Sequence, residues 1–264
     1  MIGFDGDPGL EGALHVALVG LLAVFPEHLA KPHAPAPFEG HEIARNDQFD
    51  AILRAHKHER LAIPIQALRA TGAPYHGFES MPARRFAWFV PSILSSWLER
   101  APGPGEEPFG ANDIEQMAGD VEWTEEEAAG LDAFFATALD AALATPLREA
   151  RAPEHERPLE DGVRVWSLHS PSVPLDVLRV ARALGVDIDP LVVRWALDPS
   201  PLALDHLLEA VYDTVVASKH FLSHEAVAER LGSAFFEATG ERQQRLSKAE
   251  VTVRRNIARR EDQH

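Results

Sequence analysis

A helix-start signal followed by apolar residues at helical spacing constrains the fold of this chain more than any other feature. Thr124 and Glu127 form a capping box. The stripe that follows comprises Leu131, Phe134, Phe135, Ala138, Leu139, Ala142 and Leu143. Three further helix starts are marked by Ser172 with Pro174, Ser200 with Pro201, and Ser247 with Glu250, the last a second capping box. The sequence therefore predicts a mostly α fold, an irregular helical bundle.

Only residues 162–168, GVRVWSL, alternate as a strand does, so we expect at most one short strand or hairpin there. The stretch before them is rich in proline and charged residues, which is typical of a linker. We therefore predict two subdomains: a larger N-terminal helical domain over residues 1–148, a linker over 149–161, and a smaller C-terminal helical domain over 162–264.

The net charge of −16 is concentrated in one part of the chain. Residues 101–161 carry 16 acidic and 3 basic side chains, whereas residues 162–264 carry 14 acidic and 13 basic ones. Such an acidic segment repels nucleic acid and favours a basic protein partner. The alternative is a solvated acidic surface that keeps the protein soluble.

The stretch RRFAWFVPSILSSWLER, residues 84–100, has the spacing of a helix with one core face. Its core positions, Phe86, Val90, Ile93, Leu94 and Trp97, fall within an arc of about 100°. Arg84, Arg85 and Ser92 fall on the opposite, polar face, and so does Trp88. Three interpretations of Trp88 stay open: cover by Tyr75, Phe78 or a loop, an anchor in a partner surface, or a ligand pocket where Pro91 kinks the helix.

The chain has no cysteine, which excludes disulfides, thiolate metal sites and thiol catalysis and fits a cytoplasmic location. No phosphate-binding loop, HExxH pair or nucleophile elbow occurs. His56 and His58 would share a face only on a strand, and the sequence before them is typical of a helix. We therefore expect no metal, no cofactor and no catalytic residue, although an enzyme built from dispersed residues stays open.

The longest apolar run, residues 12–25, spans 14 residues and is too short for a membrane helix. It is interpreted as a buried first helix, with His15 in the core, and no membrane contact is expected.

Two segments of the C-terminal part bear on the question of nucleic acid binding. Residues 223–232, SHEAVAERLG, resemble the first helix of a helix-turn-helix motif, but Gly240 would interrupt the second helix and Phe235–Phe236 favour a core. Residues 242–260 are basic, with the charge spread around a helix that Leu246, Val253 and Ile257 would dock. Contact with the acidic segment of the same or a second chain stays open, and nucleic acid binding is not expected.

Residues 75–145 resemble an uncharacterised bacterial helical domain family. The resemblance lies in an aromatic-rich helix with a proline after an apolar residue, followed by an acid-capped helix with an aromatic pair. Here Val90 stands before the proline, where the family has leucine, and Phe134–Phe135 replaces Phe-Leu. The family has no established activity, so the resemblance implies a helical fold and transfers no functional residue.

These features favour a non-enzymatic, acidic protein-binding module that neutralises or adapts a basic partner in a bacterium, for example a toxin, a nuclease or part of an assembly. Homo-oligomerisation stays open. The alternative is an enzyme with a pocket between the two domains. The candidate partner-binding residues are Trp88, Arg84, Arg85, Glu125 and Glu126.

Overall fold

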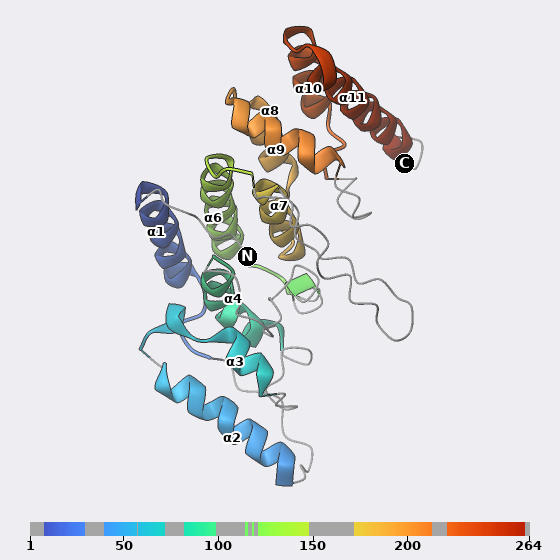
Figure 1. Ribbon diagram of the computed structural model, residues 1–264. Coiled ribbons are helices and arrows are strands. Elements are labelled where there is room, and N and C mark those ends of the chain that lie inside the picture. Colours follow the sequence, from blue (N-terminus) through green and yellow to red (C-terminus); the bar gives the residue numbers. More distant parts are fainter. Residues whose placement is uncertain are drawn as a thin grey trace, which may run out of the picture. The chain divides into compact units, whose positions relative to one another are not determined.

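The computed structural model describes residues 8–29, 40–56, 58–71, 82–98, 114–115, 118, 121–147, 172–212 and 221–261 (Figure 1). These residues form helices and contain no strand, which confirms the predicted mostly α fold. The helices are α1 (Pro8–Val24), α2 (Gly40–Ala55), η1 (Arg60–Ala62), α3 (Ile65–Ala70), α4 (Ala83–Leu98), α6 (Glu125–Leu143), α7 (Val173–Ala183), α8 (Asp189–Leu197), α9 (Pro201–Tyr212), α10 (Glu225–Glu237) and α11 (Gly240–Glu261). The predicted strand over 162–168 and linker over 149–161 lie outside the described residues.

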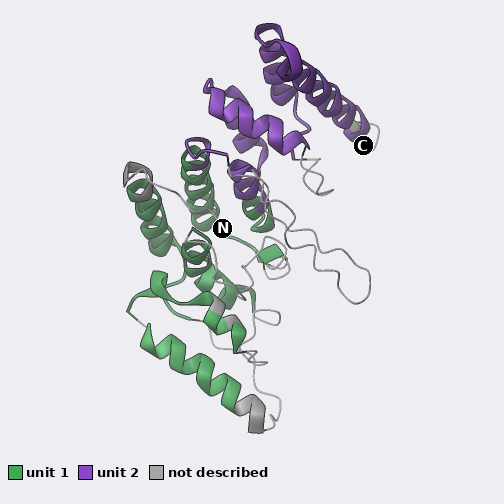
Figure 2. Ribbon diagram, viewed as in Figure 1, with its two compact units in different colours: residues 1–141, 180–187 green, residues 142–179, 188–264 purple. Residues whose placement is uncertain are grey.

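The chain divides into two compact units (Figure 2). Unit 1 comprises Met1–Ala141 and Val180–Asp187, and unit 2 comprises Ala142–Arg179 and Ile188–His264. Two of the boundaries between the units therefore fall inside helices, one near the end of α6 and one within α7.

In unit 1, α1 buries only one of its faces. Leu14, Leu18 and Leu21 are at most 5% exposed, whereas Val16 on the opposite side is 70% exposed. His15 is exposed as well. The predicted burial of the first helix therefore holds for one face only, and the prediction that His15 lies in the core was wrong. Apolar residues all around a helix do not determine which of its sides contact other elements.

Helix α4 forms the centre of the unit 1 core. All five residues of its predicted core face are buried: Phe86, Val90, Ile93, Leu94 and Trp97. Pro91 lies inside the helix, where it has no N–H to donate to the carbonyl of Ala87.

Residues 180–187 belong to unit 1 and contain the end of α7. Gly185 follows the end of this helix with a φ of +76°, which suits glycine. The N–H of Val186 donates to the carbonyl of Ala181 at 3.0 Å, and that of Gly185 to Arg182 at 2.8 Å, which is the Schellman pattern. The Trp123 indole N–H donates to the carbonyl of Leu184 at 2.7 Å and joins this segment to the chain before α6.

In unit 2, the turn between α8 and α9 is held by local hydrogen bonds. The hydroxyl of Ser200 accepts from the N–H of Ala203 at 3.0 Å, which confirms the predicted helix start. Trp195, 1% exposed, donates its indole N–H to the carbonyl of Ala203 at 3.0 Å. His206 of α9 is fully buried, with Nε2 2.7 Å from the carbonyl oxygen of Thr145. The core histidine expected at position 15 is thus found on another helix.

Helices α10 and α11 pack side by side as a hairpin at the C-terminal end of unit 2 (Figure 1). Gly240, with a φ of +62°, lies at the break between them, as its position in the sequence suggested. The capping box predicted at Ser247 and Glu250 was wrong, because α11 runs unbroken from Gly240 to Glu261. Neither glycine nor proline interrupts the sequence after Gly240, so this Ser-x-x-Glu pattern lies within the helix.

Candidate functional site

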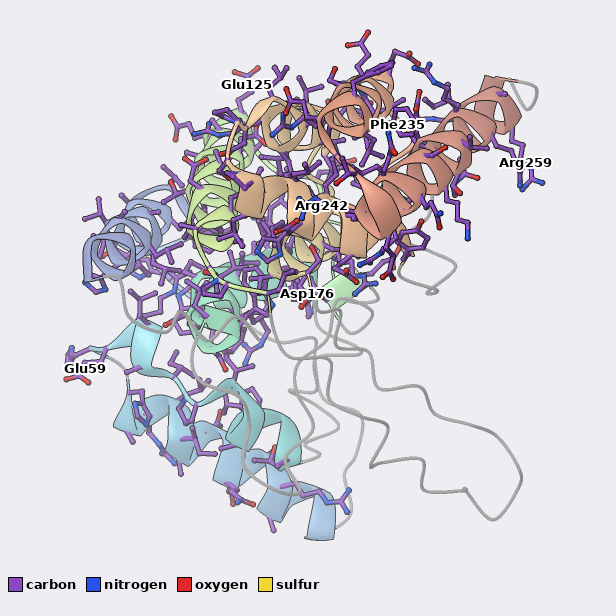
Figure 3. All side chains as sticks on the ribbon, turned by 45° about the horizontal axis from the view of Figure 1, so that its top comes forward. Glu59, Glu125, Asp176, Phe235, Arg242 and Arg259 are labelled. Carbon is purple, nitrogen blue, oxygen red and sulfur yellow. The ribbon has the colours of Figure 1, made fainter. Side chains whose placement is uncertain are left out.

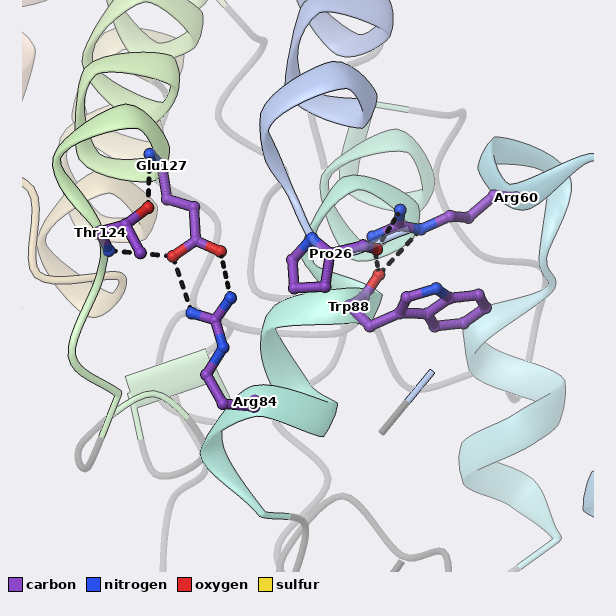
Figure 4. Close-up of polar contacts among 6 residues, drawn as sticks. All are labelled: Pro26, Arg60, Arg84, Trp88, Thr124 and Glu127. Carbon is purple, nitrogen blue, oxygen red and sulfur yellow. Dashed lines mark hydrogen bonds and ion pairs between the residues drawn. The ribbon is translucent and has the colours of Figure 1, made fainter. Parts of the chain in front are cut away.

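Glu127 joins the first turn of α6 to the start of α4 within unit 1 (Figure 4). Its backbone N–H donates to the hydroxyl of Thr124 at 3.2 Å, and its carboxylate accepts from the Thr124 N–H at 2.9 Å. The predicted capping box is therefore confirmed. The guanidinium of Arg84 donates to both carboxylate oxygens of Glu127, at 2.8 and 2.7 Å. This two-point geometry is the strong form of an arginine–carboxylate pair.

The electrostatics keep Glu127 charged. Burial alone would raise the pKa of the Glu127 carboxyl, but the hydrogen bonds from Arg84 and Thr124 outweigh it and hold that pKa below its usual value. The same pair raises the pKa of Arg84. Glu127 therefore acts as a structural carboxylate that fixes the turn in which Glu125 and Glu126 stand.

The structure corrects the predicted polar face of α4. Arg84 lies at the surface, with 48% of its side chain exposed, although its guanidinium is bound to Glu127. Arg85, proposed as a partner-binding residue on this face, is only 3% exposed, and Ser92 is fully buried. The hydroxyl of Ser92 donates to the carbonyl of Arg60 at 2.8 Å, so η1 covers part of the face that the helical spacing assigned to solvent.

Trp88 is half-buried and contacts Arg60 of η1 (Figure 4). The Arg60 guanidinium lies 4.7 Å from the ring centroid and donates to the carbonyl of Trp88. It also donates to the carbonyl of Pro26 at 2.9 Å. The indole N–H of Trp88 donates to the carbonyl of Glu27 at 3.1 Å.

This arrangement gives Trp88 a structural role inside unit 1. Arg60 and the turn after α1 occupy its ring face and its N–H, whereas the residues expected to cover it, Tyr75 and Phe78, lie outside the described residues. Burial lowers the pKa of Arg60 to about 10, so the guanidinium keeps its charge at neutral pH. A contact between Trp88 and a partner stays a prediction.

The described part of the acidic segment presents carboxylates from α6 and the residues before it. Glu125 and Glu126 are exposed in the first turn of the helix, and Figure 3 shows Glu125 pointing outward. The other exposed acidic residues of this region are Glu115, Glu122, Asp132 and Asp140. No lysine or arginine occurs between positions 114 and 147. Residues 101–113 and 148–161 of the predicted acidic segment lie outside the described residues.

Carboxylates in the first turn of a helix also have a local explanation, because they interact favourably with the positive end of the helix dipole. This explanation accounts for Glu125 and Glu126 but not for Asp132, which lies two turns further on. Residues Glu125, Glu126 and Asp132 are hereafter called the α6 acidic face.

The basic helix α11 uses three of its arginines inside unit 2. Arg242 binds Asp205 at 2.6 Å, and Arg245 binds Glu209 at 2.5 Å, both on α9. Arg254 binds Glu225 of α10 at 2.8 Å and Glu250 of its own helix at 3.0 Å. Leu246 and Val253 are buried, so the predicted docking of this helix by apolar side chains is confirmed at these two positions, whereas Ile257 is only half-buried.

Sequence reasoning missed the exposure of Phe236. It was expected in a core together with Phe235, yet 83% of it is exposed. A signal was present, since Phe236 stands on the opposite side of a helix from Val227 and Leu231, which are buried. Two consecutive residues of a helix lie about 100° apart around its axis, so both members of an aromatic pair need not face the core.

Among the described residues, no group of three or more His, Asp or Glu side chains is placed to hold a metal ion. Within the same residues, no helix combines the length and apolar character needed to cross a membrane.

No protein-family model, curated protein or solved structure matches this chain. The resemblance of residues 75–145 to a bacterial helical domain family therefore stays a prediction.

Proposed function

We propose that this chain is a protein-binding module whose α6 acidic face contacts a basic surface on another protein. The observation that carries the proposal is the exposure of Glu125, Glu126 and Asp132 on a helix with no basic residue between positions 114 and 147. Carboxylates grouped in this way attract lysine- and arginine-rich surfaces and accelerate their encounter.

The α6 acidic face is also preorganised. Glu127 locks the first turn of α6 through the capping box and the pair with Arg84, so the backbone of Glu125 and Glu126 is fixed before a partner arrives. Ordering a surface in advance reduces the entropy lost on binding.

A partner of this chemistry is compatible with two biological roles. In one, the chain neutralises a basic toxin or nuclease, and in the other it is an adaptor that binds a basic component of a larger assembly. Both roles are proposed for the cytoplasm, with which a sequence free of cysteine is compatible.

The proposal is tested by titrating a fluorescein-labelled peptide of about 20 residues, rich in lysine and arginine, and measuring its anisotropy in about 0.05 M and 0.2 M NaCl. The variant Glu125→Gln/Glu126→Gln removes two carboxylates from the α6 acidic face. The control Asp47→Asn/Glu59→Gln makes the same change in net charge at two exposed positions elsewhere in unit 1.

We expect binding that weakens with salt, and a loss of affinity for the α6 variant that exceeds the loss for the control by about tenfold. Equal losses for the two variants would show that the peptide responds only to net charge, and would contradict the proposal.

A further inference from the structure

Helix α10 exposes an aromatic ring between carboxylates. Glu229 and Phe236 lie about 20° apart around the helix axis, with Ser233 beside them, and all three are exposed. Glu237 is exposed next to Phe236. Phe236 is 83% exposed, and its ring lies edge-on to that of Phe235 at 5.4 Å. Glu229, Phe236 and Glu237 are called the acidic stripe.

Helix α11 exposes a row of cations. Lys248, Arg255 and Arg259 fall within an arc of about 40° around the helix axis and are all exposed. Figure 3 shows Arg259 projecting near the C-terminal end of α11. Val251, 51% exposed, lies beside this row. Among the residues that the structure describes, no carboxylate forms an ion pair with these three cations, which are called the basic stripe.

The ion pairs of α11 show which way the basic stripe faces. Contacts with α9 run through Arg242 and Arg245 on one edge, and contacts with α10 run through Arg254 on the other edge. The buried residues Leu246 and Val253 lie between these edges. The basic stripe is on the opposite side of the helix and therefore faces away from the core.

Glu229 and Phe236 face away from the core in the same way, opposite the buried Val227 and Leu231 of α10. Glu237 lies at the edge of this outer side, about 80° from Glu229 around the helix axis. The two helices run antiparallel, since Glu225 contacts Arg254 and the Phe235 carbonyl accepts from the side chain of Gln243. Because both helices bury the same side of the hairpin, the two stripes lie next to each other on its outer surface.

From this juxtaposition we infer that the outer surface of the α10–α11 hairpin binds the same surface of a second copy of this chain. A two-fold axis parallel to the helices places the acidic stripe of each copy against the basic stripe of the other. Phe236 and Val251 supply apolar contact between the charges. The result is a four-helix arrangement of two hairpins.

A second copy is favoured over a purely basic protein or a nucleic acid because it matches both stripes at once. A basic protein would pair with the acidic stripe and leave Lys248, Arg255 and Arg259 facing like charges. A nucleic acid would pair with the basic stripe, while Glu229 and Glu237 repelled its phosphates. Self-complementarity is the property that a two-fold interface requires.

The inference is tested by sedimentation velocity on the full chain over a concentration series to about 200 μM. We expect wild-type protein to associate as its concentration rises. Phe236→Ser should weaken the association by about tenfold or more, because an aromatic anchor between charges carries much of the energy of an interface. The control Val16→Ser alters an apolar side chain on α1 that is 70% exposed, and should leave the association unchanged.

Charge exchange gives the second test. Lys248→Glu/Arg255→Glu leaves two glutamates beside Arg259, so both stripes carry a net negative charge. Glu229→Lys/Glu237→Lys makes both stripes basic, so each variant alone should be a monomer. Mixed together, the two variants offer opposite charges at both contacts and should associate again. Asp47→Lys/Glu59→Lys changes the net charge as the second variant does, but away from the hairpin, and should associate like wild type.

The exchanged positions are exposed, so circular dichroism and thermal unfolding are expected to show folded proteins in every case. Wild-type protein that stays monomeric throughout the series would overturn the inference. A mixture of the two charge variants that fails to associate, or a Phe236→Ser variant that associates as wild type does, would overturn it as well. These outcomes are independent of peptide binding by the α6 acidic face.

Discussion

Arg84 binds both carboxylate oxygens of Glu127, across 43 positions of sequence, and thereby fastens the start of α4 to the first turn of α6. Glu127 makes two sets of contacts, to Arg84 and to Thr124, whereas Arg84 contributes to only one of them. The two residues therefore differ in how much stability each should contribute.

We expect Glu127→Ala to lower the free energy of unfolding by about 2 kcal/mol, because it removes both the capping box and the ion pair. Arg84→Ala should cost only about 1 kcal/mol, since the side chain is 48% exposed and the capping box remains. Urea denaturation followed by circular dichroism measures both values. Equal losses would show that the capping box contributes nothing.

Glu127 should also make stability depend on pH. Its folded-state pKa lies below the ordinary value of 4.5, so its contribution is present above about pH 4.5 and is lost as the pH falls through the folded-state pKa. Unfolding of wild type and Glu127→Gln at a series of pH values measures this. Below about pH 4.5, the free energy of unfolding should fall less for the variant than for wild type. An equal fall for the two proteins in this pH range would contradict the lowered pKa of Glu127.

The contact between Arg60 and Trp88 predicts a graded series of variants. Arg60→Ala should lower the free energy of unfolding by about 3 kcal/mol, because it leaves two backbone carbonyls without this donor and uncovers the indole ring. Trp88→Phe keeps a ring under the guanidinium and loses only the hydrogen bond to Glu27, which should cost about 1 kcal/mol. The reverse order of the two losses in urea denaturation would contradict this account.

Two glycines on neighbouring helices should respond in opposite directions to alanine. A Cβ at Gly130 of α6 would lie 2.8 Å from Val24 Cγ2, whereas a Cβ at Gly20 of α1 would meet nothing within 4 Å. Gly130→Ala should therefore destabilise by about 1 kcal/mol, and Gly20→Ala should stabilise by about the same amount.

Thermal unfolding measures both variants, together with Val24→Ala and the double variant Gly130→Ala/Val24→Ala. Because Val24→Ala removes the clashing methyl group, the stability losses of Gly130→Ala and Val24→Ala should not add in the double variant. Additive losses would show that the helices do not meet as closely as the structure has them.

His224 caps α10 with a ring nitrogen, which accepts from the N–H of Ala226 at 3.1 Å. His224→Ala should therefore cost about 1 kcal/mol, whereas His224→Asn supplies another acceptor and should restore most of the loss. Hydrogen exchange of the first amides of α10 checks this locally, and equal exchange in the two variants would contradict the cap.

The helices and their core stripes could be predicted because caps and apolar spacing act locally. Thr124 and Glu127, the buried stripe of α4 and the turn at Gly185 all follow from residues within a few positions of one another. Such signals do not depend on which element lies nearby.

Which further faces are covered depends on distant residues, and here prediction from the sequence failed. Ser92 is buried because η1, about 30 positions earlier, packs on the polar side of α4. Val16 is exposed although it is apolar, because helix α1 has its neighbours on the other side. The exposure of the α6 carboxylates could be predicted from their charge. The conformation of the first turn of α6 also depends on the ion pair between Arg84 and Glu127, which the sequence did not indicate.

The hydrogen bond from Trp123 to the carbonyl of Leu184 spans 61 positions and lies wholly within unit 1. A gene fragment that stopped in the proline-rich stretch after α6 would encode the tryptophan without its acceptor. A protein consisting of unit 1 alone must therefore include residues 180–187 as well as residues 1–141.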